Sequence, residues 1–354
     1  MHKAFEIGGV LLLALGLCGS QALADEMTPE AQKKLIVEGV MLHDKGDYDA
    51  ALAKYQQVLA ANPGNVEALY ETTLTLGAKQ DWKRCYEMAE GALAADSRYK
   101  ALLYANAGNC RDGAGEADKA IALYERGLRE FPNESGLTYN LGIAYIGKRE
   151  MAKAREMLER TVTLRPDYGS ANFALAKVYE DGGQRVPALL AYLRYLSLDS
   201  GSQRAKAAAE AVRALLKQGV STEGSGNVTI SISNPGTGSA LSTLDLTLSL
   251  LAASSQLDTN KGKTEIQLTA ETFDSLFAVA GESKVDQKDC FACRHYLPFF
   301  IDLEKQNLVE PFTYVALASL ALPGTAGWLD DKANAAKMQA LGKWSASKAA
   351  AGKK

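Results

Sequence analysis

The chain has 354 residues, of which 47% are hydrophobic and 23% are charged, as in an ordinary globular protein. This length is sufficient for two domains. The formal net charge of −3 argues against a nucleic-acid partner, because such a partner would require a basic face. After the first two dozen residues, no stretch is long and apolar enough to span a membrane.

Residues 1–24 have the features of a secretory signal peptide. A positive charge lies near the N-terminus, residues 8–17 are apolar, and an Ala-Leu-Ala site predicts cleavage after Ala24. The alternative is a lipoprotein anchored at Cys18, but a lipobox requires a small residue directly before the cysteine, and Leu17 is not one. We therefore expect the mature chain to be periplasmic or secreted.

Residues 32–202 repeat a pattern of side-chain sizes. One register of small residues, with steps of 34, 35, 34 and 34 residues, comprises Ala51, Cys85, Ala120, Ala154 and Ala188. A second register, which is often aromatic, comprises Tyr55, Ala89, Tyr124, Leu158 and Tyr192. A third register, again of small residues, comprises Gly39, Thr73, Gly108, Gly142 and Ala176. Three of the five units close on a proline, namely Pro63, Pro132 and Pro166.

This pattern resembles the tetratricopeptide repeat, whose period is about 34 residues. The resemblance covers roughly half the chain and implies a right-handed superhelix of stacked helix pairs. The implied repeats, followed by a capping helix, run over about 32–65, 66–99, 101–134, 135–168, 169–202 and 203–217. We expect the glycine of the first helix to face the small residue of the second. The tyrosine is then expected to fill the space farther along.

A linker and a mainly helical domain are expected after the repeats. Residues 219–239 are rich in Gly and Ser, which is typical of a flexible linker, although the alternating residues 228–233 allow a short strand. Leucines and phenylalanines at helical spacing predict helices through most of 240–354. The expected class is thus all-α, with a tetratricopeptide domain over 25–218 and a smaller helical domain over 240–354.

The resemblance also implies a binding surface. Ligands of this family lie against recurring positions on the first helix of each repeat, in the concave groove. In this sequence those positions include Tyr70, Leu74, Asn109, Asp112, Tyr139, Ile143, Ile146, Phe173, Lys177 and Glu180. Their mostly apolar character favours a protein or peptide segment with apolar anchors. The expected anchors are Tyr70, Tyr139, Ile143 and Phe173. The alternative is that several of these residues pack against neighbouring repeats or the C-terminal domain.

Four of the five cysteines follow the expected cleavage site. Cys290 and Cys293 form a C-x-x-C motif, which in an oxidising compartment predicts either a disulfide or two buried thiols. Cys85 and Cys110 lie in adjacent repeats on faces that can meet. A disulfide and two free thiols are both consistent with that placement. A c-type haem would need His directly after Cys293, and a zinc site would need a second ligand pair, so no cofactor or metal is expected.

The sequence predicts a non-enzymatic scaffold that binds a protein or peptide in the periplasm. It contains no phosphate-binding glycine loop, zinc-protease motif or nucleophile elbow. One alternative is a thiol–disulfide redox protein that uses Cys290 and Cys293. The other is a structural subunit of an envelope complex that oligomerises through Phe299, Phe300 and Phe312.

Overall fold

The computed structural model describes residues 27–223, 227–230, 239–255, 260, 262–283 and 290–351. The expected signal peptide, with its cleavage site and Cys18, lies outside the described residues. So do residues 224–226 and 231–238 of the expected linker. The described chain is almost entirely helical, which confirms the all-α class.

Antiparallel helix pairs follow one another from Pro29 to Leu196, and an eleventh helix closes the series. The helices are α1 (Pro29–Asp44), α2 (Tyr48–Ala61), α3 (Val66–Ala78), α4 (Trp82–Ala92), α5 (Lys100–Gly113), α6 (Ala117–Glu130), α7 (Ser135–Gly147), α8 (Met151–Leu164), α9 (Gly169–Asp181), α10 (Arg185–Leu196) and α11 (Gln203–Lys217). Each pair coincides with one expected repeat, so the helical repeats are confirmed.

Polar caps and prolines set the ends of these helices. Thr28, Asp47 and Asn65 precede α1, α2 and α3, and each side chain accepts a backbone N–H from the first turn. Pro63 and Pro166 lie two residues beyond the ends of α2 and α8. A proline there keeps the chain from continuing the helix, because it has no N–H to donate and its ring clashes with the preceding turn.

A ring packed directly on a glycine joins the two helices of a repeat. A Cβ on Gly39 would overlap the ring of Tyr55, and one on Gly108 would overlap the ring of Tyr124. The tyrosine, and not the alanine that we expected, is therefore the nearest neighbour of the glycine. Ala51 is fully buried one turn earlier on the second helix.

The remaining repeats use other residues at the same two positions. In the fourth repeat, where the second helix carries Leu158, a Cβ on Gly142 would lie 3.0 Å from the leucine Cγ. In the second repeat the first helix has Thr73 and the second has Ala89, and both are fully buried. The contact between a glycine and a ring is therefore a feature of the first and third repeats.

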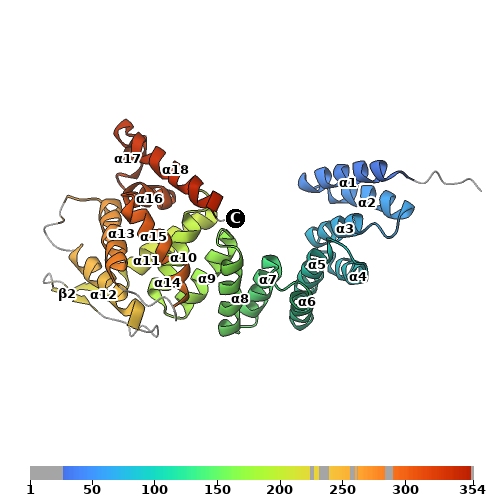
Figure 1. Ribbon diagram of the computed structural model, residues 1–354, viewed down its shortest axis with the longest axis horizontal. Helices are drawn as coiled ribbons and strands as arrows, with labels where there is room; N and C mark the ends of the chain where they lie inside the picture. Colours follow the sequence, from blue (N-terminus) through green and yellow to red (C-terminus); the bar gives the residue numbers. More distant parts are fainter. Residues whose placement is uncertain are drawn as a thin grey trace, which may run out of the picture.

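The first helices form the inner layer of the stack. Helix α1 contacts α3, α3 contacts α5, and α5 contacts α7, whereas each second helix contacts chiefly the two first helices that flank it. A stack of helix pairs curves toward the side on which neighbours lie closer. The repeats thus form a curved arm whose inner face is made by α1, α3, α5, α7 and α9 (Figure 1).

The C-terminal helices gather at the far end of the arm (Figure 1). They are α12 (Ser239–Ser254), α13 (Glu265–Glu282), α14 (Phe291–His295), α15 (Leu297–Lys305), α16 (Val309–Ala316), α17 (Thr325–Asp330) and α18 (Ala335–Ala351), with 3-10 turns η2 (Ala318–Leu320) and η3 (Lys332–Asn334). Helices α14 and α15 are separated at Tyr296, and Pro298 occupies the first turn of α15, where the missing N–H of a proline costs nothing.

Part of the expected linker forms a β-hairpin. Strand β1 (Val220–Glu223) pairs antiparallel with β2 (Asn227–Ile230), so that Val220 lies opposite Ile230. The strand expected over 228–233 therefore begins one residue earlier, at Asn227. Its pairing with β1 was not expected, because the glycine-rich composition indicated a flexible linker.

The C-terminal helices share one hydrophobic core with the last repeat, because α10 is buried along its whole length. Arg185, at the start of α10, donates to the Leu215 carbonyl at 2.8 Å and to the Ser249 hydroxyl at 2.9 Å, and lies 3.6 Å from the Asp245 carboxylate. This buried cation joins α10, α11 and α12. The C-terminal helices contact α8, α10 and α11, so they cover the outer layer at the end of the arm.

The aromatic residues that were considered for oligomerisation lie inside this core. Phe300 is fully buried and Phe312 is 4% exposed, and the two rings pack 6.0 Å apart. Phe299 packs on Trp344, with the Arg194 guanidinium 4.5 Å from its ring. The hypothesis of an interface built from these three rings is therefore wrong, because their surface is already used within the chain.

Replacing Gly108 by alanine is expected to lower the free energy of unfolding by about 1–3 kcal/mol, because the added methyl would overlap the Tyr124 ring. Gly91 is the matched control, since it also lies in a helix and has open space around it. Gly91→Ala should leave the stability unchanged or raise it by up to about 1 kcal/mol. Urea unfolding followed by circular dichroism measures both, and equal losses would contradict the packing account.

Candidate functional site

The sequence-predicted binding residues all lie on helices of the inner face. Helix α3 carries Tyr70 and Leu74, α5 carries Asn109 and Asp112, α7 carries Tyr139, Ile143 and Ile146, and α9 carries Phe173, Lys177 and Glu180. They do not share one environment. The aromatic residues are half-buried between repeats, whereas Asn109, Asp112, Ile143 and Lys177 are exposed.

The aromatic members pack against the start of the following repeat or against α10. Tyr70 and Tyr99 lie with ring centroids 5.3 Å apart, and Tyr139 and Tyr168 with centroids 4.9 Å apart. Phe173 meets Tyr195 edge-on at 5.3 Å. Burial raises the pKa of Tyr70, as expected for a phenol removed from water. These rings therefore fix one repeat on the next and present only part of their surface outward.

The exposed apolar surface of the inner face comes from aliphatic residues. Ile143 is 36% exposed, Leu102 is 40% exposed, and Leu74 is half-buried. Sequence reasoning missed Leu102. The sequence did indicate that Leu102 shares a face with a predicted binding residue. It is the second residue of the third repeat and precedes Asn109 by seven residues, which is two helical turns on the same face of α5. We call Leu74, Leu102 and Ile143 the aliphatic stripe.

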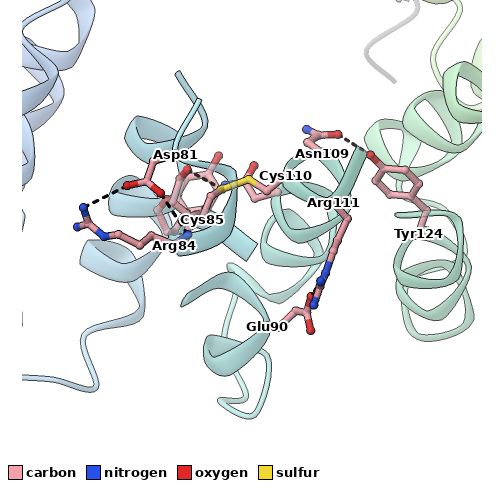
Figure 2. Close-up of a disulfide and its surroundings, with 11 residues drawn as sticks. Asp81, Arg84, Cys85, Glu90, Asn109, Cys110, Arg111 and Tyr124 are labelled. Atoms are coloured by element: carbon pink, nitrogen blue, oxygen red, sulfur yellow. Dashed lines mark hydrogen bonds and ion pairs between the residues drawn. A yellow bond between two sulfur atoms is a disulfide. The ribbon is translucent and has the colours of Figure 1, made fainter. Parts of the chain in front are cut away.

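Polar residues of the inner face are held by hydrogen bonds. The Tyr124 hydroxyl donates to the side-chain oxygen of Asn109 at 2.7 Å (Figure 2), which leaves the exposed amide N–H groups of Asn109 facing away from that bond. Glu180 accepts from Lys177 at 2.8 Å and from the Tyr192 hydroxyl at 2.7 Å. Burial acts against the charge of Glu180, but these two donors hold its pKa below the usual value.

A disulfide braces the middle of the arm. Cys85 of α4 and Cys110 of α5 are joined and buried, so the second and third repeats are cross-linked (Figure 2). Next to Cys110, Arg111 donates to Glu90 of α4 at 2.6 Å. Cys110 and Arg111 thus attach the last turn of α5 to α4 by a covalent bond and an ion pair.

Cys290 and Cys293 form a second disulfide at the start of α14. Cys293 is fully buried and Cys290 is half-buried. His295 lies with its Nε2 3.5 Å from the Thr163 hydroxyl of α8, while burial and Arg294 lower its pKa. The cysteine pair therefore sits where α14 packs on the repeats. Within the described chain the only sheet is the β1–β2 hairpin, so α14 has no thioredoxin-like surroundings there.

The described residues contain neither a cluster of metal ligands nor a membrane-spanning helix. Among them, no group of three or more His, Cys, Asp or Glu side chains is arranged to hold a metal ion. Likewise, no helix in that part of the chain is long and apolar enough to cross a membrane.

Two parts of the arm match known repeat families. Residues 37–74 and residues 113–171 each match a tetratricopeptide repeat family, and both ranges lie within the stack of helix pairs. The arm therefore contains tetratricopeptide repeats. Proteins of this kind generally mediate protein–protein interactions, and the fold is typically a non-catalytic scaffold. No curated protein matches the chain in sequence.

Solved structures resemble the repeat half of the chain. A thermophilic tetratricopeptide protein of Thermus thermophilus is 25% identical, with 52% of this chain and 100% of that one covered and a TM-score of 0.45. PilF of Pseudomonas aeruginosa is 21% identical, with coverages of 53% and 90% and a TM-score of 0.43. MamA of Desulfovibrio magneticus is 17% identical, with coverages of 50% and 99% and a TM-score of 0.41.

Tyr139→Ala is expected to lower the free energy of unfolding by about 1–3 kcal/mol, because it removes a half-buried ring contact between repeats. Ile143→Ala, on the same helix one turn later, should cost less, because 36% of Ile143 is exposed to solvent. Urea unfolding of the two variants distinguishes the roles. If Tyr139→Ala were silent, Tyr139 would be a free binding residue and not a spacer between repeats.

Proposed function

We propose that this tetratricopeptide repeat protein is an exported, non-enzymatic scaffold that holds an extended segment of a protein partner on its inner face. The observation that carries the proposal is the aliphatic stripe. Ile143 and Leu102 keep more than a third of their surface exposed on helices that are otherwise fixed by ring contacts and a disulfide. Apolar side chains exposed on a rigid surface favour binding, because little ordering is needed when a partner docks.

The spacing of the stripe suits an extended chain of a particular kind. Its residues come from the successive first helices α3, α5 and α7, and packed helices lie about 8–10 Å apart. A polyproline II chain rises about 3.1 Å per residue and returns to the same face every third residue, after roughly 9 Å. An extended segment crossing the inner face could therefore reach successive first helices with apolar side chains about three residues apart, with Leu102 two helical turns from the level of Leu74 and Ile143.

Polar groups beside the stripe can satisfy the backbone of such a segment. The Asn109 oxygen is occupied by Tyr124, so its exposed N–H groups are available to a peptide carbonyl. A polyproline II segment makes no internal hydrogen bonds, so its carbonyls need donors from the receptor or from water. This arrangement supports a protein ligand over a small apolar molecule.

Export is the second part of the proposal. It is supported by the signal-peptide pattern of residues 1–24 and by the two cysteine pairs, because disulfides persist in oxidising compartments such as the periplasm. The proposed mature chain begins at Asp25 and acts outside the cytoplasm.

The peptide proposal is tested by selecting twelve-residue peptides from a random phage-displayed library on the immobilised chain. Enriched peptides should carry several apolar residues, and a Leu102→Ser/Ile143→Ser variant should bind them at least tenfold more weakly, because the docked apolar area is lost. Fluorescence anisotropy of a labelled peptide measures the affinity.

The matched control for this test is Leu198→Ser. Leu198 is 39% exposed, nearly the same as the stripe residues, but lies after α10 and away from the inner face. This variant should bind the selected peptides like the unchanged chain. Failure to enrich any peptide, or equal binding by the two serine variants, would remove the proposal.

The export proposal predicts the mass of the chain isolated from a bacterium that has a periplasm. After alkylation without reductant, the intact mass should correspond to residues 25–354 with none of the four cysteines alkylated, because cleavage and oxidation both accompany export. A mass that includes residues 1–24, or a lipid on Cys18, would contradict soluble export, and four alkylated thiols would contradict an oxidising compartment.

A further inference from the structure

A cavity of about 370 Å³ lies between the capping helix α11 and the C-terminal helices, on a different surface from the inner face. Its residues on α13 recur at Glu265, Leu268, Thr269 and Thr272, which is one face of the first two turns. Small-molecule sites in proteins measure roughly 300–1,000 Å³. This cavity is therefore large enough for a small ligand and too small for a folded segment of protein.

The interior of the cavity is aliphatic. The turn after α16 contributes Leu317, Leu320 and Leu322, and α13 contributes Leu268. The polar residues within it offer little to a ligand, because Thr269 and Thr272 donate their hydroxyl hydrogens to backbone carbonyls of their own helix at 2.8 Å. The interior therefore suits a hydrocarbon chain.

The edge of the cavity is charged. Arg213 donates Nε and Nη2 to the Glu265 carboxylate, both at 2.6 Å, and Lys217 lies 2.8 Å from the same carboxylate. The three side chains are 30–61% exposed, so they stand where the cavity meets solvent. Two cations share one carboxylate. Arg213 and Lys217 therefore keep N–H groups that Glu265 does not occupy.

From this arrangement we propose that the cavity binds a free medium-chain fatty acid, with the hydrocarbon among the leucines and the carboxylate on Arg213 and Lys217. Hydrogen bonds from Arg213 hold the pKa of Glu265 below its usual value, so the charged edge keeps one positive charge in excess at neutral pH. The ligand carboxylate uses the spare donors and leaves the Arg213–Glu265 pair in place. This site does not depend on the peptide-binding proposal.

The test is isothermal titration of the full chain with three probes, namely decanoate below its micellar concentration, decanol and acetate. Decanoate should bind with saturation at one equivalent, decanol more weakly, and acetate not at all, because the chain and the charge each contribute. Arg213→Gln should weaken decanoate roughly tenfold and leave decanol unchanged, since a charge-assisted hydrogen bond is lost.

Two cavity-filling variants and one control complete the design. Leu268→Trp and Ala252→Leu both add volume to the cavity wall and should abolish binding of decanoate and decanol. A thermal melt checks each fold, and Ala252→Leu decides the test if the larger substitution does not fold. Lys263→Gln is the control, because Lys263 also pairs with a carboxylate, Glu271 at 2.7 Å, but does not line the cavity.

The proposal is overturned by any of three results. The first is that the full chain does not bind decanoate. The second is that a folded cavity-filling variant binds it as well as the unchanged chain. The third is that Arg213→Gln and Lys263→Gln have equal effects, because the carboxylate would then not be recognised at the edge of the cavity.

Discussion

The contact between a glycine on the first helix of a repeat and a ring on the second determines much else in this structure. With no side chain on Gly39 or Gly108, the ring can lie on the helix backbone itself, and the two helices pack at a fixed separation. The other repeats use different residues at the two positions, such as Thr73 with Ala89 in the second repeat and Gly142 with Leu158 in the fourth. Repeats of equal shape stack into a regular arm, and an irregular repeat would interrupt the inner face.

The inner face is the surface that this stacking leaves accessible. Half-buried rings such as Tyr139 join successive repeats, the Cys85–Cys110 disulfide braces the second repeat to the third, and the C-terminal helices pack on the outer layer. Aliphatic side chains thereby stay exposed on rigid helices. The same C-terminal packing creates the cavity beside α11, so the chain carries two surfaces of different chemistry, one proposed to bind a peptide and one proposed to bind a fatty acid.

The sequence predicted the repeat half closely, because a period of about 34 residues is a local signal that each helix pair repeats. It identified the helices of the inner face. It did not distinguish Tyr139, which packs between repeats, from Ile143, which is exposed, because that difference depends on the contact of Tyr139 with Tyr168 at the start of the next repeat. The C-terminal packing was not predicted, since it rests on contacts distant in sequence, such as Arg185 with Asp245. One part of the sequence did indicate that further elements pack on the last repeat. Helix α10 is apolar on all sides, and such a helix must be covered by other parts of the chain.

A double-mutant cycle between positions 108 and 124 tests the central claim most directly. Urea unfolding gives the free energies of Gly108→Ala, Tyr124→Leu and the double variant. If the ring and the glycine fix the helix separation together, the smaller leucine should relieve part of the strain of the added methyl, because a Cβ on Gly142 would lie 3.0 Å from Leu158 whereas one on Gly108 would overlap the Tyr124 ring. The account predicts a coupling free energy of about 1–2 kcal/mol. Costs that add to within about 0.5 kcal/mol would show that the two residues act independently and would contradict it.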